Sequence, residues 1–192
     1  MKKQVSLIII LLTLTFGIFS FANKNLIPSV SATYVEGPIT QDTIWTLVES
    51  PFVVSRDVII YATLTIEPGV EVRFGGNFSM LVAGKIVANG TENKPIKFTS
   101  NSLQPNIGDW QSINFTGTEM SYLTNCVVEY GTNAIAVTNS LLAIQNSEVK
   151  NSENGILSTN ASVEINNSNI SFCSQNGILV TDGELEASNS FV

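Results

Sequence analysis

A short motif that returns every 21 or 22 residues constrains the fold of this chain more than any other feature. The motif is an asparagine, a cysteine or serine, any residue, and a valine or isoleucine. It begins at Asn125, Asn146, Asn167 and Asn189. A second motif, an asparagine followed by alanine or glycine and then isoleucine, keeps the same step and begins at Asn133, Asn154 and Asn176. Two independent motifs in one register indicate a repeated structural unit.

Each repeat contains a short segment in which apolar residues alternate, as Leu142 does with Ile144 and Val163 does with Ile165. Such alternation is typical of β-strands that bury one face. A period near 21 without helical spacing therefore predicts an all-β fold, a parallel β-helix whose successive coils stack equivalent positions on one another. We expect the coil to be right-handed, because parallel crossover connections nearly always have that hand.

The repeated asparagines of the first motif have a structural explanation. Asparagine tolerates the left-handed backbone conformation that a tight corner needs, and stacked amides can bond to the coils on either side. We therefore expect a structural ladder of side chains at one corner of the coil. Its members are Asn125, Asn146, Asn167 and Asn189.

The part of the chain before these repeats resembles a known family. The segments that carry the resemblance are residues 63–74, 81–91, 95–100 and 108–110. They look like the entry coils of secreted right-handed parallel β-helix repeat proteins of the pectate-lyase-like superfamily, which are common on prokaryotic cell surfaces. The resemblance covers roughly residues 40 to 192 and is specific for fold rather than for activity.

The N-terminal pattern described below and this resemblance together imply a division of the chain into three parts. Residues 1–32 form a leader, residues 33–62 form an N-terminal cap over the end of the coil, and residues 63–192 form the β-helix. The stretch between Ser100 and Trp110 is rich in asparagine, proline and glycine, which indicates an inserted loop.

The leader has the features of a secretory signal peptide. Lys2 and Lys3 precede an apolar stretch from residue 5 to residue 21, and Ala22 and Ala32 offer two cleavage sites. The alternative is an uncleaved membrane anchor, since the apolar stretch is close to the length of a membrane span. Polar residues within the stretch favour cleavage. We therefore expect a secreted or cell-surface protein with no membrane span after cleavage.

Composition excludes several classes of function. The chain has no histidine, which removes Ser-His and Cys-His nucleophile pairs and histidine-ligated zinc. Its net charge of −7 is opposite in sign to that of a typical nucleic-acid-binding protein, so we expect no nucleic-acid partner. Its four aspartates are scattered, and no register brings two of them together as a catalytic pair. The sequence therefore predicts a protein that is not an enzyme and has no catalytic residues.

The two cysteines are predicted to be free thiols. Cys126 and Cys173 lie 47 residues apart, which is about two coils of the repeat. Neighbouring parallel strands are about 4.8 Å apart, so two coils separate the cysteines by ~10 Å along the axis. That separation is too large for a disulfide bond.

Two binding sites can be placed on the repeat. Glu164 and Glu186 occupy equivalent positions on adjacent coils, where carboxylates about 5 Å apart repel unless a cation lies between them. Calcium is therefore a candidate ligand, and a solvated acidic surface is the alternative; no other cofactor is expected. Trp110, Tyr122 and Tyr130 could form a carbohydrate-contact platform, or could instead fill core and corner positions.

These features predict an exported structural or recognition module that presents a rigid β-helix face to a glycan, an envelope polymer or a surface protein. The alternative is the N-terminal part of a carbohydrate-active enzyme, a polysaccharide lyase or hydrolase, whose catalytic coils lie outside this chain. Residue 192 is the last residue of the fourth asparagine motif. We therefore expect the C-terminal end of the coil to dock on further coils or on a partner.

Overall fold

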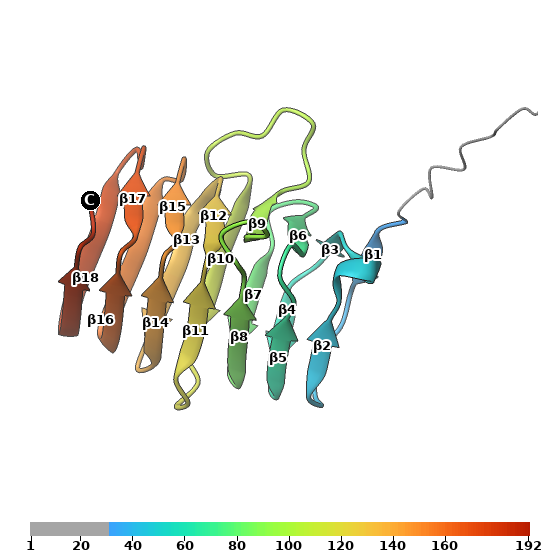
Figure 1. Cartoon of the computed structure of the whole chain (residues 1–192), viewed down its shortest axis with the longest axis horizontal. Helices are drawn as coiled ribbons and strands as arrows, with labels where there is room; N and C mark the ends of the chain where they lie inside the picture. The colour runs from blue at the N-terminus through green and yellow to red at the C-terminus, as the bar shows by residue number, and fades with distance from the viewer. Residues whose placement is uncertain (1–30) are drawn as a thin grey trace, which may run out of the picture.

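The structure is a computed structural model of the chain, and it describes residues 31–192. The predicted signal peptide, residues 1–32, lies outside the described residues except for its last two. The described chain winds into an all-β solenoid whose coils of about 22 residues stack along one axis (Figure 1). The β-helix predicted from the repeat is therefore confirmed as a parallel β-solenoid. Within residues 31–192, no helix is long and apolar enough to cross a membrane.

The first side of the solenoid, here called face A, is a seven-stranded parallel sheet to which each coil contributes one strand. The strands are β1 (Thr33–Val35), β3 (Phe52–Val54), β6 (Glu71–Phe74), β9 (Ile96–Ser100), β12 (Cys126–Glu129), β15 (Glu148–Lys150) and β17 (Asn169–Ser171). All of their pairings join one coil to the next, so face A runs the full length of the described solenoid.

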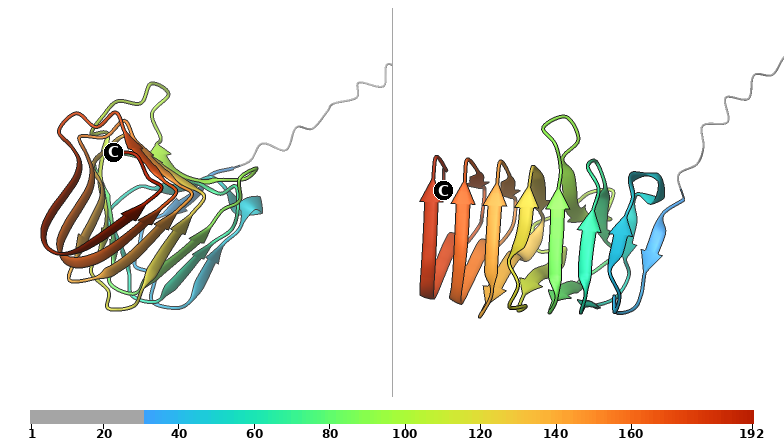
Figure 2. Two further views of the ribbon diagram at one scale, coloured as in Figure 1. Left: turned by 60° about the vertical axis from the view of Figure 1, so that its left-hand side comes forward. Right: turned by 60° about the horizontal axis from the view of Figure 1, so that its bottom comes forward.

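The other two sides, faces B and C, are joined into one larger sheet. Face B contains β4 (Val58–Ile60), β7 (Ser79–Val82), β10 (Trp110–Phe115) and β13 (Gly131–Thr138). Face C contains β2 (Thr43–Trp45), β5 (Thr63–Ile66), β8 (Lys85–Asn89), β11 (Ser121–Thr124) and β14 (Leu141–Gln145). The long strands β16 (Asn154–Asn166) and β18 (Asn176–Ser188) run through both faces and connect them. Each coil thus passes from face A to B to C (Figure 2).

The core fills the space between the three faces. Leu142, Ile144, Val163 and Ile165, which the alternation predicted to point inward, are each at most 1% exposed. Their equivalents in β18 are more open, and Leu185 is 37% exposed because no further described coil covers it. Burial of these apolar side chains by the neighbouring coils is the main force that holds the stack together.

All three corners of the coil use left-handed backbone conformations. The corner between faces C and A has Asn125, Asn146, Asn167 and Asn189, with φ of 49° or 50°. The corner between faces B and C has Asn139, Asn160 and Asp182. The corner between faces A and B has Tyr130, Asn151 and Phe172. Asparagine and aspartate tolerate this conformation better than other non-glycine residues, which explains why they recur at one-coil intervals.

The segment predicted to cap the coil, residues 33–62, contains strands β1 to β4 and one 3-10 turn, η1 (Leu47–Glu49). These strands pair in parallel with strands of the same three faces: β1 with β3, β2 with β5, and β4 with β7. Inside this part of the solenoid, Trp45 stacks on Phe52 with ring centroids 4.6 Å apart. Residues 33–62 therefore supply regular strands to the sheets.

Residues 101–109 leave the coil between β9 and β10 and form the projecting loop of Figure 1. Asp109 holds the ends of this loop together, because its Oδ2 accepts hydrogen bonds from Ser100 Oγ (2.6 Å) and from the backbone N–H of Asn106 (3.0 Å). Strands β9 and β10 on either side remain paired with the next coil. The inserted loop predicted from composition therefore lies outside the regular coil.

Candidate functional site

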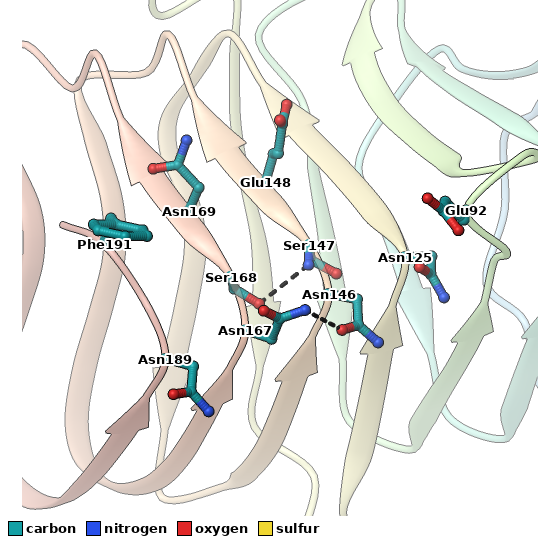
Figure 3. A pocket seen from close by; sticks show the side chains of 10 residues that line it. All are labelled: Glu92, Asn125, Asn146, Ser147, Glu148, Asn167, Ser168, Asn169, Asn189 and Phe191. Atoms are coloured by element: carbon teal, nitrogen blue, oxygen red, sulfur yellow. Dashed lines mark hydrogen bonds between the residues drawn. The ribbon is translucent and has the colours of Figure 1, made fainter.

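A groove of about 560 Å³ runs along the corner between faces C and A (Figure 3). It crosses four successive coils, and the asparagines of that corner line it along its length. Glu92 lies at one end and Phe191 at the other. The residues that line it are Glu92, Asn125, Asn146, Ser147, Glu148, Asn167, Ser168, Asn169, Asn189 and Phe191.

Each of these asparagines occupies the left-handed position of the corner. Asn146, Asn167 and Asn189 are exposed, and Asn125 is half-buried. Asn167 Nδ2 donates to Asn146 Oδ1 at 2.6 Å, and Asn125 Nδ2 donates to the carbonyl oxygen of Gly90 at 3.2 Å. Within residues 31–192, the amide nitrogen of Asn146 and the amide oxygen of Asn167 have no such bond. These groups are available to a ligand in the groove.

A column of buried serines lies directly beneath the asparagines and fixes their spacing. The hydroxyl of Ser147 accepts from the backbone N–H of Cys126 (3.0 Å), and that of Ser168 accepts from the N–H of Ser147 (3.1 Å). Each hydroxyl also donates to the carbonyl oxygen two residues earlier, at 2.7 Å for Ser147 and 2.9 Å for Ser168. The serine of the repeated motif is therefore structural, and it gives the groove a rigid floor.

Cys126 begins the same column in place of a serine. It is 1% exposed, and its Sγ donates to the carbonyl oxygen of Thr124 at 3.4 Å. Burial raises the pKa of the Cys126 thiol well above its usual value. Cys126 and Cys173 are both free, as predicted from their spacing. A buried thiol with a raised pKa is a poor nucleophile, so Cys126 acts here as a packing residue.

The groove is polar and carries negative charge. Glu92 is exposed and Glu148 is half-buried, and Glu148 forms an ion pair with Lys150 on the same strand. Phe191 is 77% exposed and supplies the single aromatic surface among the lining residues. Amides both donate and accept hydrogen bonds, whereas carboxylates only accept them. This set of groups complements a ligand rich in hydroxyls.

The three aromatic residues predicted to contact carbohydrate do not share a surface. Trp110 is completely buried, where it stacks on Phe74 at 4.0 Å and donates through Nε1 to the carbonyl oxygen of Glu129. This burial rules out the sugar contact predicted for Trp110. Tyr122 is exposed on face C beside Lys85, and Tyr130 is half-buried at the corner between faces A and B. The two tyrosines therefore lie on different sides of the solenoid.

Glu164 and Glu186, the predicted calcium ligands, are register partners on face C. Ala143 precedes Glu164 in the same outward column, so the acidic pair extends no further along the solenoid in that direction. Among residues 31–192, no group of three or more histidine, cysteine, aspartate or glutamate side chains is arranged to hold a metal ion. Calcium binding by this pair remains a prediction.

The repeat gave no indication that Glu129 is buried, yet this charged residue is only 6% exposed. Its Oε1 lies 3.1 Å from Lys97 Nζ and accepts a hydrogen bond from Thr99 Oγ1 at 3.0 Å. Both partners lie on β9, in a coil without the asparagine motif, so the repeat gave no signal for them. Glu92, at one end of the groove, also lies outside the motif, whereas Phe191, at the other end, occupies the variable position of the fourth copy.

No protein-family model, curated protein or solved structure matches this chain.

Proposed function

We propose that this chain is an exported, non-catalytic recognition module that binds a neutral polysaccharide along the groove between faces C and A. One observation carries the proposal: Asn125, Asn146, Asn167 and Asn189 line one groove from four successive coils. Parallel strands are about 4.8 Å apart, so the groove offers an amide at that interval over roughly 14 Å. Such a row suits an extended polymer with repeating hydroxyl groups.

The chemistry of the groove favours an uncharged sugar. Each amide can donate to one hydroxyl and accept from another, and Glu92 and Glu148 can accept from further hydroxyls. The exposed ring of Phe191 offers an apolar surface against which a sugar ring can pack. An anionic polysaccharide would meet these two carboxylates and a chain of net charge −7, so electrostatic repulsion disfavours it.

Export is supported by the basic start, apolar stretch and small residues of positions 1–32. The resemblance to secreted β-helix proteins of the pectate-lyase-like superfamily supports a location at the cell surface. The lack of histidine and the scattered aspartates support a module without catalysis, although fold alone carries no function. The second hypothesis remains a polysaccharide lyase or hydrolase whose catalytic coils lie outside this chain.

The test compares binding of neutral and acidic polysaccharides by affinity electrophoresis. The double variant Asn146→Gly and Asn167→Gly removes two groove amides while glycine keeps the left-handed backbone. Two hydrogen bonds contribute roughly 1–3 kcal/mol, so we expect the affinity for the neutral polymer to fall by a factor of about 5 to 150.

The matched control is Asn139→Gly with Asn160→Gly. These residues form the same kind of amide pair, at 2.7 Å, on the corner between faces B and C. Equal losses in the two double variants, or no binding of any neutral polymer, would contradict the groove as the site. Release of unsaturated products or new reducing ends, with or without calcium, would instead support the enzyme hypothesis.

A further inference from the structure

Face B differs from the other two sides of the solenoid because its strands carry no charged residue. Strands β4, β7, β10 and β13 and the face B halves of β16 (residues 154–159) and β18 (residues 176–181) contain no aspartate, glutamate, lysine or arginine. The strands of face A, by contrast, contain six charged residues, which are Glu71, Arg73, Lys97, Glu129, Glu148 and Lys150. Those of face C contain Lys85, Glu164, Glu184 and Glu186. In a chain of net charge −7, one side is therefore neutral along six coils.

The outward side chains at the middle of face B form one registered column. Strand pairing places each residue beside its equivalent in the next coil. In chain order the column is Ile59, Leu81, Asn114, Ala136, Leu157 and Leu179. Leu157 is half-buried and Leu179 is 45% exposed although both point away from the core. Beside this column, Thr138, Thr159 and Thr181 form a second one in register.

Within the six strands of face B, this central column has the same pattern of size when it is read in either direction. Two large aliphatic residues stand at each end, and the shorter Asn114 and Ala136 stand in the middle. A two-fold axis that runs parallel to the strands, between the coils of Asn114 and Ala136, would oppose Ile59 to Leu179 and Leu81 to Leu157. A surface that matches itself in this way is what a two-fold symmetric interface requires.

We propose that face B is a self-association surface on which a second copy of this chain packs with its coil axis antiparallel. Charge supports this occupant, because contact through face B keeps the acidic groups of both copies away from each other. Packing of two sheets through their outer side chains is a common arrangement in β proteins. The polysaccharide groove lies at the corner opposite face B, so this surface does not involve it.

The size of face B predicts the strength of this contact. Six strands about 4.8 Å apart and on average about 18 Å long cover ~500 Å² on each copy, or ~1,000 Å² in total. This value lies at the lower end of the range for specific protein interfaces. We therefore expect a reversible dimer whose population rises with protein concentration.

Sedimentation equilibrium of the purified protein over a range of concentrations tests the proposal. Leu157→Lys places a charge at the interface of both copies, and we expect it to raise the dimer dissociation constant at least about tenfold. Thr159→Lys, at an exposed position of the same face, serves as a second variant that cannot disturb the core. The matched control is Leu141→Lys on face C, where the leucine is 36% exposed, and it should change the constant less than about twofold.

Several outcomes would overturn the proposal. A protein that stays monomeric at all concentrations, or a dimer weakened equally by Leu141→Lys, excludes face B. A dimer that dissociates at high salt would also exclude face B, because salt screens the repulsion between the acidic faces and should therefore strengthen contact through a neutral surface. A dimer that instead assembles only when a neutral polysaccharide is added would place the contact at the groove.

The antiparallel orientation has its own test, by oxidative crosslinking in a Cys173→Ser background. A cysteine that replaces Thr138 lies about one coil spacing from its copy, ~5 Å along the axis, whereas one that replaces Thr181 lies about five spacings away, ~24 Å. We expect crosslinked dimers from Thr138→Cys and few from Thr181→Cys. Equal crosslinking of the two variants would overturn the antiparallel arrangement.

Discussion

At the scale of the residue, the corner between faces A and B is the least favourable of the three. It places the aromatic residues Tyr130 and Phe172 in the left-handed conformation, with φ of 69° and 53°, on either side of Asn151. A residue with a bulky side chain pays roughly 1–2 kcal/mol for this conformation, whereas asparagine adopts it more readily. Tyr130 packs against the core, but Phe172 is 78% exposed and loses little contact area if it is replaced.

We therefore expect Phe172→Asn to raise the free energy of unfolding by about 0.5–1 kcal/mol, since it relieves backbone strain without removing a core contact. Thermal and urea denaturation measure this change. The reverse substitution in the same column, Asn151→Phe, should lower stability by a similar amount. A loss of stability in Phe172→Asn would show that the exposed phenylalanine makes a contact that outweighs the strain.

Single residues also show how far the sequence alone could lead. The corner asparagines and the inward position of Leu142 follow from spacing, because the repeat places them at fixed points of every coil. The burial of Trp110 does not follow from spacing. Its stacking partner Phe74 lies 36 residues earlier, in a coil that lacks the asparagine motif. A tryptophan outside the repeat is equally compatible with a surface platform, and only the fold distinguishes the two.

At the scale of the element, the serine column beneath the groove joins the short strands of face A to their corners. Each of its hydroxyls accepts a hydrogen bond from a backbone N–H of the preceding coil and donates one to the carbonyl oxygen two residues earlier in its own coil. Ser147 and Ser168 are each 4% exposed, so these bonds are shielded from water. A buried backbone N–H that loses its partner is costly, which makes the column sensitive to substitution.

Ser147→Ala should lower the free energy of unfolding by roughly 1–3 kcal/mol, because it leaves the buried N–H of Cys126 without an acceptor. Urea denaturation provides the measurement. Ser162→Ala is the control, since Ser162 points outward from face C and is half-buried, and it should change stability by less than about 0.5 kcal/mol. Similar effects of the two substitutions would show that the column contributes no more than an ordinary surface serine.

The elements of residues 33–62 were harder to derive from sequence than those of the later coils. Their corners do not repeat one residue type; one of them, for example, contains a cis peptide bond between Ser50 and Pro51. The asparagine motif is absent from these residues. Without a periodic marker, their apolar residues fit a cap as well as they fit strands. The same limitation applies to the groove, because Glu92 reaches it from a turn outside the repeat.

At the scale of the whole molecule, the solenoid is a one-dimensional stack in which each coil contacts only its neighbours. Strand β16 lies between two coils, whereas β18 pairs only with β16 within the described residues. The column Val137, Ser158 and Val180 shows the difference, since the first two are 1% exposed and Val180 is 36% exposed. Local stability should therefore fall from the middle of the stack toward its last described coil.

Hydrogen exchange measured by NMR tests this gradient in a single column. We expect the backbone amide of Val137 to exchange at least about tenfold more slowly than that of Val180, because opening β18 disrupts one neighbour instead of two. Uniform protection along the column would contradict nearest-neighbour stability. It would indicate that the whole solenoid opens as one cooperative unit.

The loop of residues 101–109 has a consequence for how such a molecule can be modified. Nine residues leave the coil between β9 and β10, and the strands on both sides still pair with their neighbours. Because a hydrogen bond between Ser100 and Asp109 closes the base of the loop, the residues between them can change in sequence and number without disturbing the coil. This site is therefore a natural place to graft a foreign peptide. A solenoid that tolerates such an insertion would display the peptide at a fixed position along its axis.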